Sequence, residues 1–338
     1  MDATVIDRSL DDVLLPESTR PRKKWHPQKI WQTVGPLTIF VAMFGLVAAL
    51  TPTFVGGGGL IVVATSAAPI LLVALGQALV LNVGSIDLSN ASLTLLAAIL
   101  LAMMLAPLST AAPLVIVVIV TLFGAVNGLL VAFTQVPSFA LTLGTFGIFQ
   151  AGALVVSNAT TVYVSKNGEP IVGLFQNGVA GIPLTFWLGV GAAVLLWVTL
   201  RFTRFGQGMT AIGLNETGAI FSGMHTRWLK VAAFALSGLL AGLAGITIIA
   251  QAGSASPTGL GSDLLLPGIA AAIVGGTSIS GGSTNPINVV FGALTIALIP
   301  IATAVIGIEA QAQNLVYGVV IIAVVALTMA RSRDGVVK

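Results

Sequence analysis

Two stretches of this sequence carry polar side chains of types that could do chemistry. The first, residues 74–93, reads ALGQALVLNVGSIDLSNASL and holds a single aspartate, Asp87, among amides and serines. The second, residues 203–230, reads TRFGQGMTAIGLNETGAIFSGMHTRWLK and gathers acidic, basic and amide side chains between glycines. Neither stretch offers the positioned acid–base pair that proton-transfer catalysis needs, so we expect binding or mechanical roles.

Other signatures of an enzyme are missing from the sequence. His26 and His225 lie in separate polar segments without metal-ligand spacing, and cysteine is absent, so neither a metal site nor a thiol nucleophile is expected. The glycine runs at 56–59 and 280–283 do not continue into a lysine, as a phosphate-binding loop would. We therefore expect no enzyme and no cofactor in this chain.

Composition sets the environment in which these polar stretches must be held. The 338 residues are 56% hydrophobic and only 7% charged, with a mean hydropathy of +1.04. Soluble domains carry about 25% charged residues, so a soluble globular protein is excluded. The basic residues other than Lys166 fall in three short segments rather than on one broad face, which argues against nucleic acid. The composition predicts an all-α, polytopic helical protein whose partner is membrane lipid.

The position of the charges predicts the topology. Basic residues cluster before residue 30, within 201–230 and after residue 330. By the positive-inside rule all three clusters face the cytoplasm, together with both termini. We therefore divide the chain into a disordered cytoplasmic tail (1–30), a transmembrane domain (31–332) with a cytoplasmic loop at 201–230, and a second tail (333–338).

Apolar segments predict about ten crossings. Even numbers must separate the cytoplasmic clusters, and the segments are 34–50, 61–83, 88–106, 113–134, 137–156, 182–200, 229–250, 264–276, 287–308 and 314–330. The segment 264–276 is short, and Pro267, Gly275 and Gly276 predict a broken or tilted helix there. Parity favours a crossing, and a re-entrant hairpin is the alternative.

Small residues at helical spacing predict close helix packing. GAVNG (124–128) and SGLLAGLAG (237–245) place glycines three and four residues apart, so one face of each helix is nearly bare backbone. A hinge is the alternative interpretation of these glycines.

Asp87 allows two interpretations. In one, the preceding span ends near Val83 and Asp87 caps the next helix from a short cytoplasmic turn. In the other, the helix is broken inside the protein, and Asp87 fixes the freed backbone groups or faces a solute path, because an aspartate within a bilayer is costly and marks function. The translocation-path or helix-break residues are Gln77, Asn82, Asp87 and Ser89.

The loop 201–230 predicts a short displayed helix. Asn215 is a good N-cap, Glu216 favours the positive end of the helix dipole, and Gly223 supplies a stop. Such a helix is too short to be stable alone and needs a partner surface. We expect Gly206, Gly208 and Gly213 to separate it from the preceding span. The expected coupling residues are Gly213, Asn215, Glu216, Ala219, Ser222 and Gly223, and a solvated connector is the alternative.

These motifs together resemble a known family. TRFGQGMTAIGLNETGAIFSGM, ALGQALVLNVGSIDLSNAS, SGLLAGLAG, AAAIVGGTSISGG and QNLVYGVVIIAVVAL are similar, in order, to segments of the monosaccharide (ribose/galactose/arabinose-type) ABC transporter permeases. The likeness runs from about Ala67 to Leu327. It implies a transmembrane permease subunit of an ATP-driven importer for a monosaccharide or related small polar solute, in a bacterial cytoplasmic (inner) membrane.

The resemblance also implies partners. These are a cytoplasmic ABC ATPase subunit that binds ATP and Mg, an extracytoplasmic solute-binding protein, and a second permease. Departures from the family pattern at Gln207, Ile220 and Leu265 leave open whether the second permease is another copy or a homologue. The alternatives are a branched-chain amino-acid-type ABC permease and an ion-coupled secondary transporter, although the latter needs more intramembrane charge than Asp87.

Overall fold

The computed structural model describes residues 27–56, 58–134, 136–258, 260–307, 309 and 312–328. The chain forms two compact units, Met1–Gly35 and Pro36–Lys338. The expected tail at 333–338 and residues 1–26 of the expected N-terminal tail lie outside the described residues. Residues 27–30 begin a helix instead, because Pro27 has the backbone geometry that a first helical turn requires.

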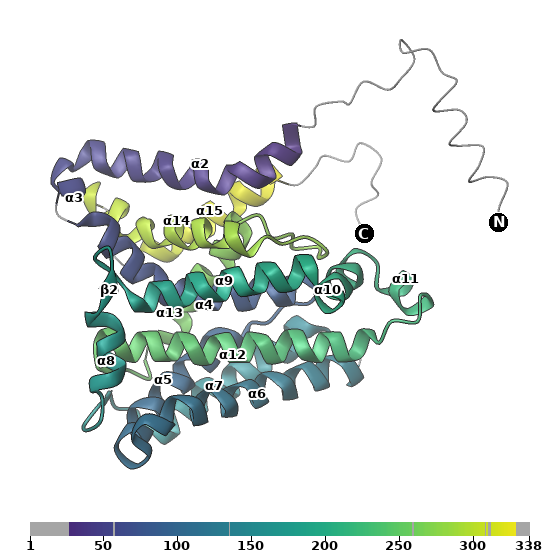
Figure 1. Cartoon of the computed structure of the whole chain (residues 1–338), viewed down its shortest axis with the longest axis horizontal. Helices are drawn as coiled ribbons and strands as arrows, with labels where there is room; N and C mark the ends of the chain where they lie inside the picture. Colours follow the sequence, from purple (N-terminus) through teal and green to yellow (C-terminus); the bar gives the residue numbers. More distant parts are fainter. Residues whose placement is uncertain are drawn as a thin grey trace, which may run out of the picture. The chain divides into compact units, whose positions relative to one another are not determined.

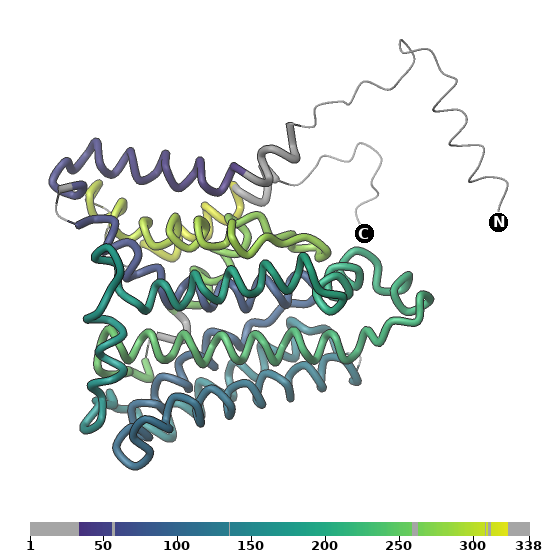
Figure 2. Tube along the Cα trace, viewed as in Figure 1, coloured from purple at the N-terminus to yellow at the C-terminus, as the bar shows by residue number. Residues whose placement is uncertain are grey.

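The described residues are almost entirely helical. In chain order the elements are α2 (Pro27–Leu50), α3 (Pro52–Gly56), α4 (Gly59–Asn82), α5 (Ser89–Leu108), η2 (Ser109–Ala111), α6 (Ala112–Thr134), α7 (Ser138–Val156), β1 (Val162–Tyr163), α8 (Glu169–Gln176), β2 (Gly178–Val179), β3 (Ile182–Pro183), α9 (Leu184–Phe202), α10 (Arg204–Leu214), α11 (Glu216–Phe221), α12 (Thr226–Ala252), β4 (Ser254–Ala255), α13 (Leu260–Val274), α14 (Pro286–Val305) and α15 (Gln313–Thr328). Two-residue strands pair antiparallel, β1 with β4 and β2 with β3. Figures 1 and 2 show the helices and their course.

The apolar helices are those of a polytopic membrane protein. Among the described residues, six helical stretches are long and apolar enough to cross a bilayer, and one of them, Ser89–Thr134, joins α5, η2 and α6. Shorter apolar helices lie at Val34–Leu50, Asp263–Val274 and Gln313–Ala323. Each predicted crossing therefore corresponds to a helix, and the prediction of an all-α membrane fold is confirmed.

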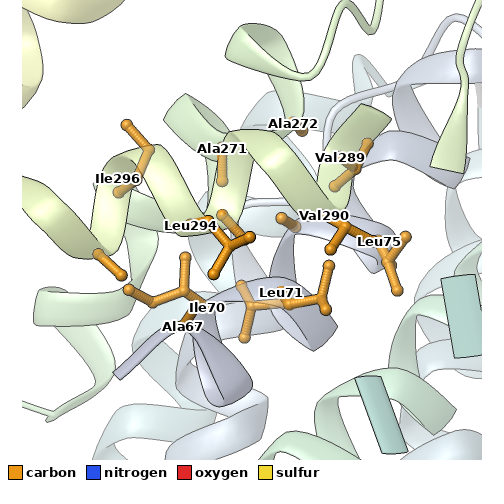
Figure 3. Packing of buried hydrophobic residues seen from close by; sticks show 14 of the residues in the cluster. Ala67, Ile70, Leu71, Leu75, Ala271, Ala272, Val289, Val290, Leu294 and Ile296 are labelled. Atoms are coloured by element: carbon orange, nitrogen blue, oxygen red, sulfur yellow. The ribbon is translucent and has the colours of Figure 1, made fainter. Parts of the chain in front are cut away.

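Helix α4 lies in the centre of the bundle. Its apolar window is 72% buried by other helices, whereas that of α7 is only 17% buried. Leu71 and Leu75 of α4 pack against the alanines of α13 and against Val290 of α14 (Figure 3). A helix that is apolar all round and buried is a core helix, and a helix that is apolar all round and exposed faces lipid.

The predicted glycine contacts are confirmed between α6 and α12. A Cβ added at Gly238 would lie 2.6 Å from the carbonyl oxygen of Val120 and 3.1 Å from the Cα of Gly124. A Cβ at Gly128 would lie 2.8 Å from the Cα of Val231. Because only glycine fits at these crossings, the two backbones touch along much of their length (Figure 1).

Helix α13 crosses the bundle. Its first turns lie beside the end of α12, where Asp263 and Gln251 line the same hollow. The loop after it lies at the opposite end, where the N–H of Gly282 donates to the carbonyl oxygen of Asn82 at 3.0 Å. This course favours a crossing over a re-entrant hairpin.

Of the two forms expected for the 264–276 segment, a broken or a tilted helix, the broken helix is wrong. Helix α13 is continuous from Leu260 to Val274, with Pro267 inside it, and Gly276 (φ 85°) adopts the left-handed conformation only after the helix has ended. Neighbouring helices re-satisfy the backbone group that a proline frees in a membrane helix, so proline is tolerated there.

Candidate functional site

The first predicted polar stretch forms a helix break inside the protein. Helix α4 ends at Asn82 and α5 begins at Ser89. The carboxylate of Asp87 contacts Ser237 of α12, which lies eleven residues, or about 16 Å at roughly 1.5 Å per residue, into that helix from Thr226. The segment between α4 and α5 therefore folds back into the bundle, and Asp87 is only 2% exposed.

Both carboxylate oxygens of Asp87 accept hydrogen bonds. Oδ1 accepts from the backbone N–H of Ser89 at 3.0 Å and from its hydroxyl at 2.6 Å. Oδ2 accepts from the hydroxyl of Ser237 at 2.9 Å. Asp87 thus binds the first N–H of α5, whose N-cap residue is Leu88, and connects α5 to α12 from a buried position.

Other amides and hydroxyls extend this network to two further helices. Asn127 of α6 donates to the Ser89 hydroxyl at 2.8 Å, and Asn90 donates to the Ser237 hydroxyl at 2.6 Å. Gln77 of α4 donates to the backbone oxygen of Asp87. The Asp87 network therefore joins α4, α5, α6 and α12 by hydrogen bonds and holds these four helices together.

Helix α7 binds the freed backbone of the break. The N–H of Ile86 donates to the hydroxyl of Ser138 at 3.0 Å, and the N–H of Leu88 donates to that of Thr142 at 3.1 Å. Irregular backbone is tolerated at membrane depth when protein groups satisfy it in this way. The sequence prediction did not include four of the residues that bond to this break. Their hydroxyl and amide groups within apolar helices could have indicated a buried polar network: Asn127, Ser138, Thr142 and Ser237.

The second predicted stretch holds two helices rather than one. Thr203 caps α10 by accepting from the N–H of Gly206 at 3.1 Å. Asn215 caps α11 by accepting from the N–H of Gly218 at 2.9 Å, as predicted. Gly223 (φ 78°) follows the helix in the left-handed conformation, which confirms it as the stop.

The expectation that Gly206, Gly208 and Gly213 isolate α11 is wrong. All three lie inside α10, where they allow close packing. A Cβ at Gly206 would overlap the backbone of Thr199 and Leu200, so α10 is pressed against the end of α9. Tertiary contact overrides the low helix propensity of glycine here.

Gly213 lies at a junction of three backbones. A Cβ there would overlap the carbonyl oxygen of Asn82, at the end of α4, and the backbone nitrogen of Gly282. A Cβ at Gly281 would lie 3.0 Å from the Cα of Gly84 and 3.1 Å from that of Gly213. We call Gly84, Gly213, Gly281 and Gly282 the glycine junction. It fixes the base of α11 to the core, beside the break that holds Asp87.

A hydrogen bond reinforces the glycine junction. The amide of Asn82 donates to the hydroxyl of Thr210 in α10 at 3.1 Å. Asn82 therefore belongs to the contact between α4 and α10, whereas Gln77, Asp87 and Ser89 belong to the buried network.

Helix α11 exposes apolar side chains. Phe221 is 87% exposed and Ile220 is 54% exposed, whereas Ala219 is buried. Glu216 forms an ion pair of 2.6 Å with Lys230 of α12, and Ser222 donates to the carbonyl oxygen of Gly218 at 2.9 Å. In Figure 1, α11 extends beyond the bundle, at the end opposite to α8. The sequence prediction did not include this exposed aromatic ring. The apolar pair Ile220 and Phe221 within a polar loop could have indicated it.

The described residues hold no cluster of three or more histidine, cysteine or acidic side chains that could bind a metal ion. The fold and these two sites define a polytopic helical membrane protein with a buried polar network around Asp87 and an exposed short helix, α11.

Comparison with known proteins gives the family. A family model described as the branched-chain amino acid transport system permease component matches residues 59–325. The chain belongs to this family of transport permeases.

The individual relatives show which members of this family the chain is similar to. The chain is 33% identical to the D-allose transport system permease protein of Escherichia coli, over 90% of this chain and 94% of the relative. It is 32% identical to the ribose import permease protein of Bacillus subtilis, over 92% and 97%, and 31% identical to the autoinducer 2 import system permease protein of Salmonella typhi, over 85% and 83%. The resemblance to monosaccharide ABC permeases is thereby confirmed. No solved structure matches the chain.

Proposed function

We propose that this chain is the membrane permease of an ATP-driven importer for a monosaccharide or a chemically related small polar solute. The observation that carries the coupling part of this proposal is α11, whose Phe221 is 87% exposed while its base is fixed in the glycine junction. A six-residue helix is too short to be stable alone. An exposed aromatic ring on a fixed base is typical of a protein contact.

The partner at α11 is a cytoplasmic ABC ATPase subunit, which binds the ATP and Mg. In this proposal Asn215, Glu216, Ser222 and Gly223 shape α11, Ala219 packs it, and Gly213 connects it to the core. ATP binding moves α11, and the glycine junction passes the movement to α4 and to the 277–285 loop. The buried network of Gln77, Asp87 and Ser89 keeps α4, α5, α6 and α12 together during this movement.

Basic and aromatic side chains next to the loop support the proposed orientation. Arg201 stacks on Trp197 at 5.5 Å, and Arg227 stacks on Phe133 at 5.3 Å. Aromatic rings mark both membrane interfaces, whereas an excess of basic residues is typical of the cytoplasmic side, so in this proposal α10 and α11 lie in the cytoplasm. The ends at α8 and β4 then face outward, where a solute-binding protein delivers the solute. A second permease, identical or homologous, completes the importer.

The names of the relatives support the solute class, because two of them import D-allose and ribose and match nearly their full length. We expect proteoliposomes that contain this chain, its ATPase and its solute-binding protein to accumulate labelled D-ribose or D-allose only when ATP is supplied. Labelled leucine serves as the control, since the family model is described by branched-chain amino acids. Accumulation of leucine without either sugar would show that the solute class is wrong.

A further inference from the structure

The bundle has a hollow at the end opposite α11. It lies where the end of α12 meets the beginning of α13, next to α4, and has a volume of about 380 Å³. Pro69, Ile248 and Leu264 form its apolar part, and Gln251, Ser256 and Asp263 contribute polar groups. We call it the α12–α13 hollow. Its volume is near the lower end of the roughly 300–1,000 Å³ typical of small-molecule sites, which is enough for one sugar ring.

The α12–α13 hollow lies on the outer side in the proposed orientation. Helix α12 has 27 residues, or about 40 Å at roughly 1.5 Å per residue, which exceeds the ~30 Å hydrocarbon core of a bilayer. It begins at Thr226, beside the cytoplasmic loop, and ends at Ala252, in the lining of the hollow. A solute released outside the membrane therefore reaches the hollow without crossing the bilayer.

The polar groups of the hollow match a neutral polyhydroxylated solute. The carboxylate of Asp263 is exposed to the hollow and accepts hydrogen bonds from hydroxyls. The amide of Gln251 is held by its bond to the carbonyl oxygen of Thr65 at 2.9 Å, which leaves its own oxygen as a second acceptor. The apolar side chains provide a surface for the C–H face of a sugar ring.

The charge of the hollow discriminates among solutes. Its lining residues include one acid, Asp263, and no base. The phosphate of a sugar phosphate would meet Asp263 without a compensating cation, which is unfavourable. A neutral sugar pays no such electrostatic penalty.

We infer that the α12–α13 hollow is the outer receiving site of the permease, which binds a neutral monosaccharide or similar polyol through Asp263 and Gln251 before translocation. This inference rests on the proposed function and extends it to a place and a charge class of solute.

A neighbouring cavity provides a matched control. It has a volume of about 340 Å³ and lies across the turn after α12, where Ser165, Lys166 and Glu169 line it. It is similar in size and on the same side of the bundle, but it contains both a base and an acid. Ser165 and Ser256 are both serines in a chain without cysteine, so each can be replaced by a single reactive cysteine.

The test measures protection of a single cysteine by solute. Ser256→Cys is placed in the complete importer and labelled with a membrane-impermeant maleimide from the outer side. The sugar that is transported, D-ribose or D-allose, should slow the labelling. At a sugar concentration [L] of about ten times its dissociation constant Kd for the hollow, the labelling rate should fall about tenfold, by the factor 1 + [L]/Kd. The labelling of Ser165→Cys should not change. Equal rates for Ser256→Cys with and without the sugar, or equal protection of both cysteines, would overturn the assignment.

A second variant guards against a failure of Ser256→Cys to fold. Asp263→Asn should raise the KM for uptake about tenfold, as expected when one hydrogen bond to a charged group is weakened, while the affinity of the solute-binding protein is unchanged. An unchanged KM would overturn the role of Asp263. If the wild-type importer accumulates leucine and neither sugar, the proposed function fails and this inference fails with it. If the wild type transports but neither variant responds, only the hollow is wrong.

Discussion

Gly213→Ala should reduce ATP-driven solute uptake to below about a tenth of the wild-type rate, although the chain still inserts into the membrane. A Cβ at this position overlaps the carbonyl oxygen of Asn82 and the backbone of Gly282. Because the overlapping atoms belong to backbone, α10 must move away from the core, at a cost of about 1–3 kcal/mol for such overpacking. Uptake by proteoliposomes, normalised to the amount of inserted protein, measures the effect.

Gly208→Ala is the matched control in the same helix. Its Cβ would meet only the two δ carbons of Leu229, at 3.0 and 3.9 Å, which are the flexible end of a side chain. Both variants gain the same helix propensity, up to about 1 kcal/mol, so any difference between them reports the junction. Transport by Gly213→Ala at the rate of Gly208→Ala would mean that the glycine junction does not transmit movement.

Asp87→Ala should destabilise the folded chain by about 3 kcal/mol or more, because it leaves three buried donors without their charged acceptor and each such bond contributes about 1.5–3 kcal/mol. The three donors are the N–H and hydroxyl of Ser89 and the hydroxyl of Ser237. We expect lower abundance in membranes and a lower unfolding temperature in detergent.

Asp87→Asn provides the comparison for this prediction. Asparagine retains an oxygen that can accept from Ser89, so only the bond from Ser237 is lost and the loss of stability should be smaller. A different outcome would be an Asp87→Ala chain that is stable but no longer transports. It would contradict the claim that Asp87 holds the helices together and would place Asp87 in the solute path.

The sequence was sufficient for features that depend on local chemistry. Long apolar segments predicted the membrane helices, because backbone groups in lipid must bond within a helix. Asn215 predicted the start of α11, because an N-cap bonds within its own turn. The glycine patterns at 124–128 and 237–245 predicted close contact, because bare backbone allows helices to approach.

Features that depend on distant residues could not be predicted in the same way. Asp87 is bonded to Ser237, 150 residues away, and no single-sequence pattern identifies that pair. The same limit explains the wrong expectation for Gly206, Gly208 and Gly213. Three glycines indicate a flexible joint by propensity, but contacts with α9, α12, α4 and the 277–285 loop hold them in a helix.

The central claim, that α11 is the contact through which an ATPase drives this permease, is tested most directly by the affinity of the purified permease for its ATPase subunit. Phe221 is 87% exposed on α11, and Leu195, the control, is 67% exposed on the apolar helix α9. Phe221→Ala should weaken the association about tenfold or more, as truncation of an aromatic anchor does. Leu195→Ala should bind as the wild type does. An equal affinity for both variants would contradict the claim and would leave the loop as a solvated connector.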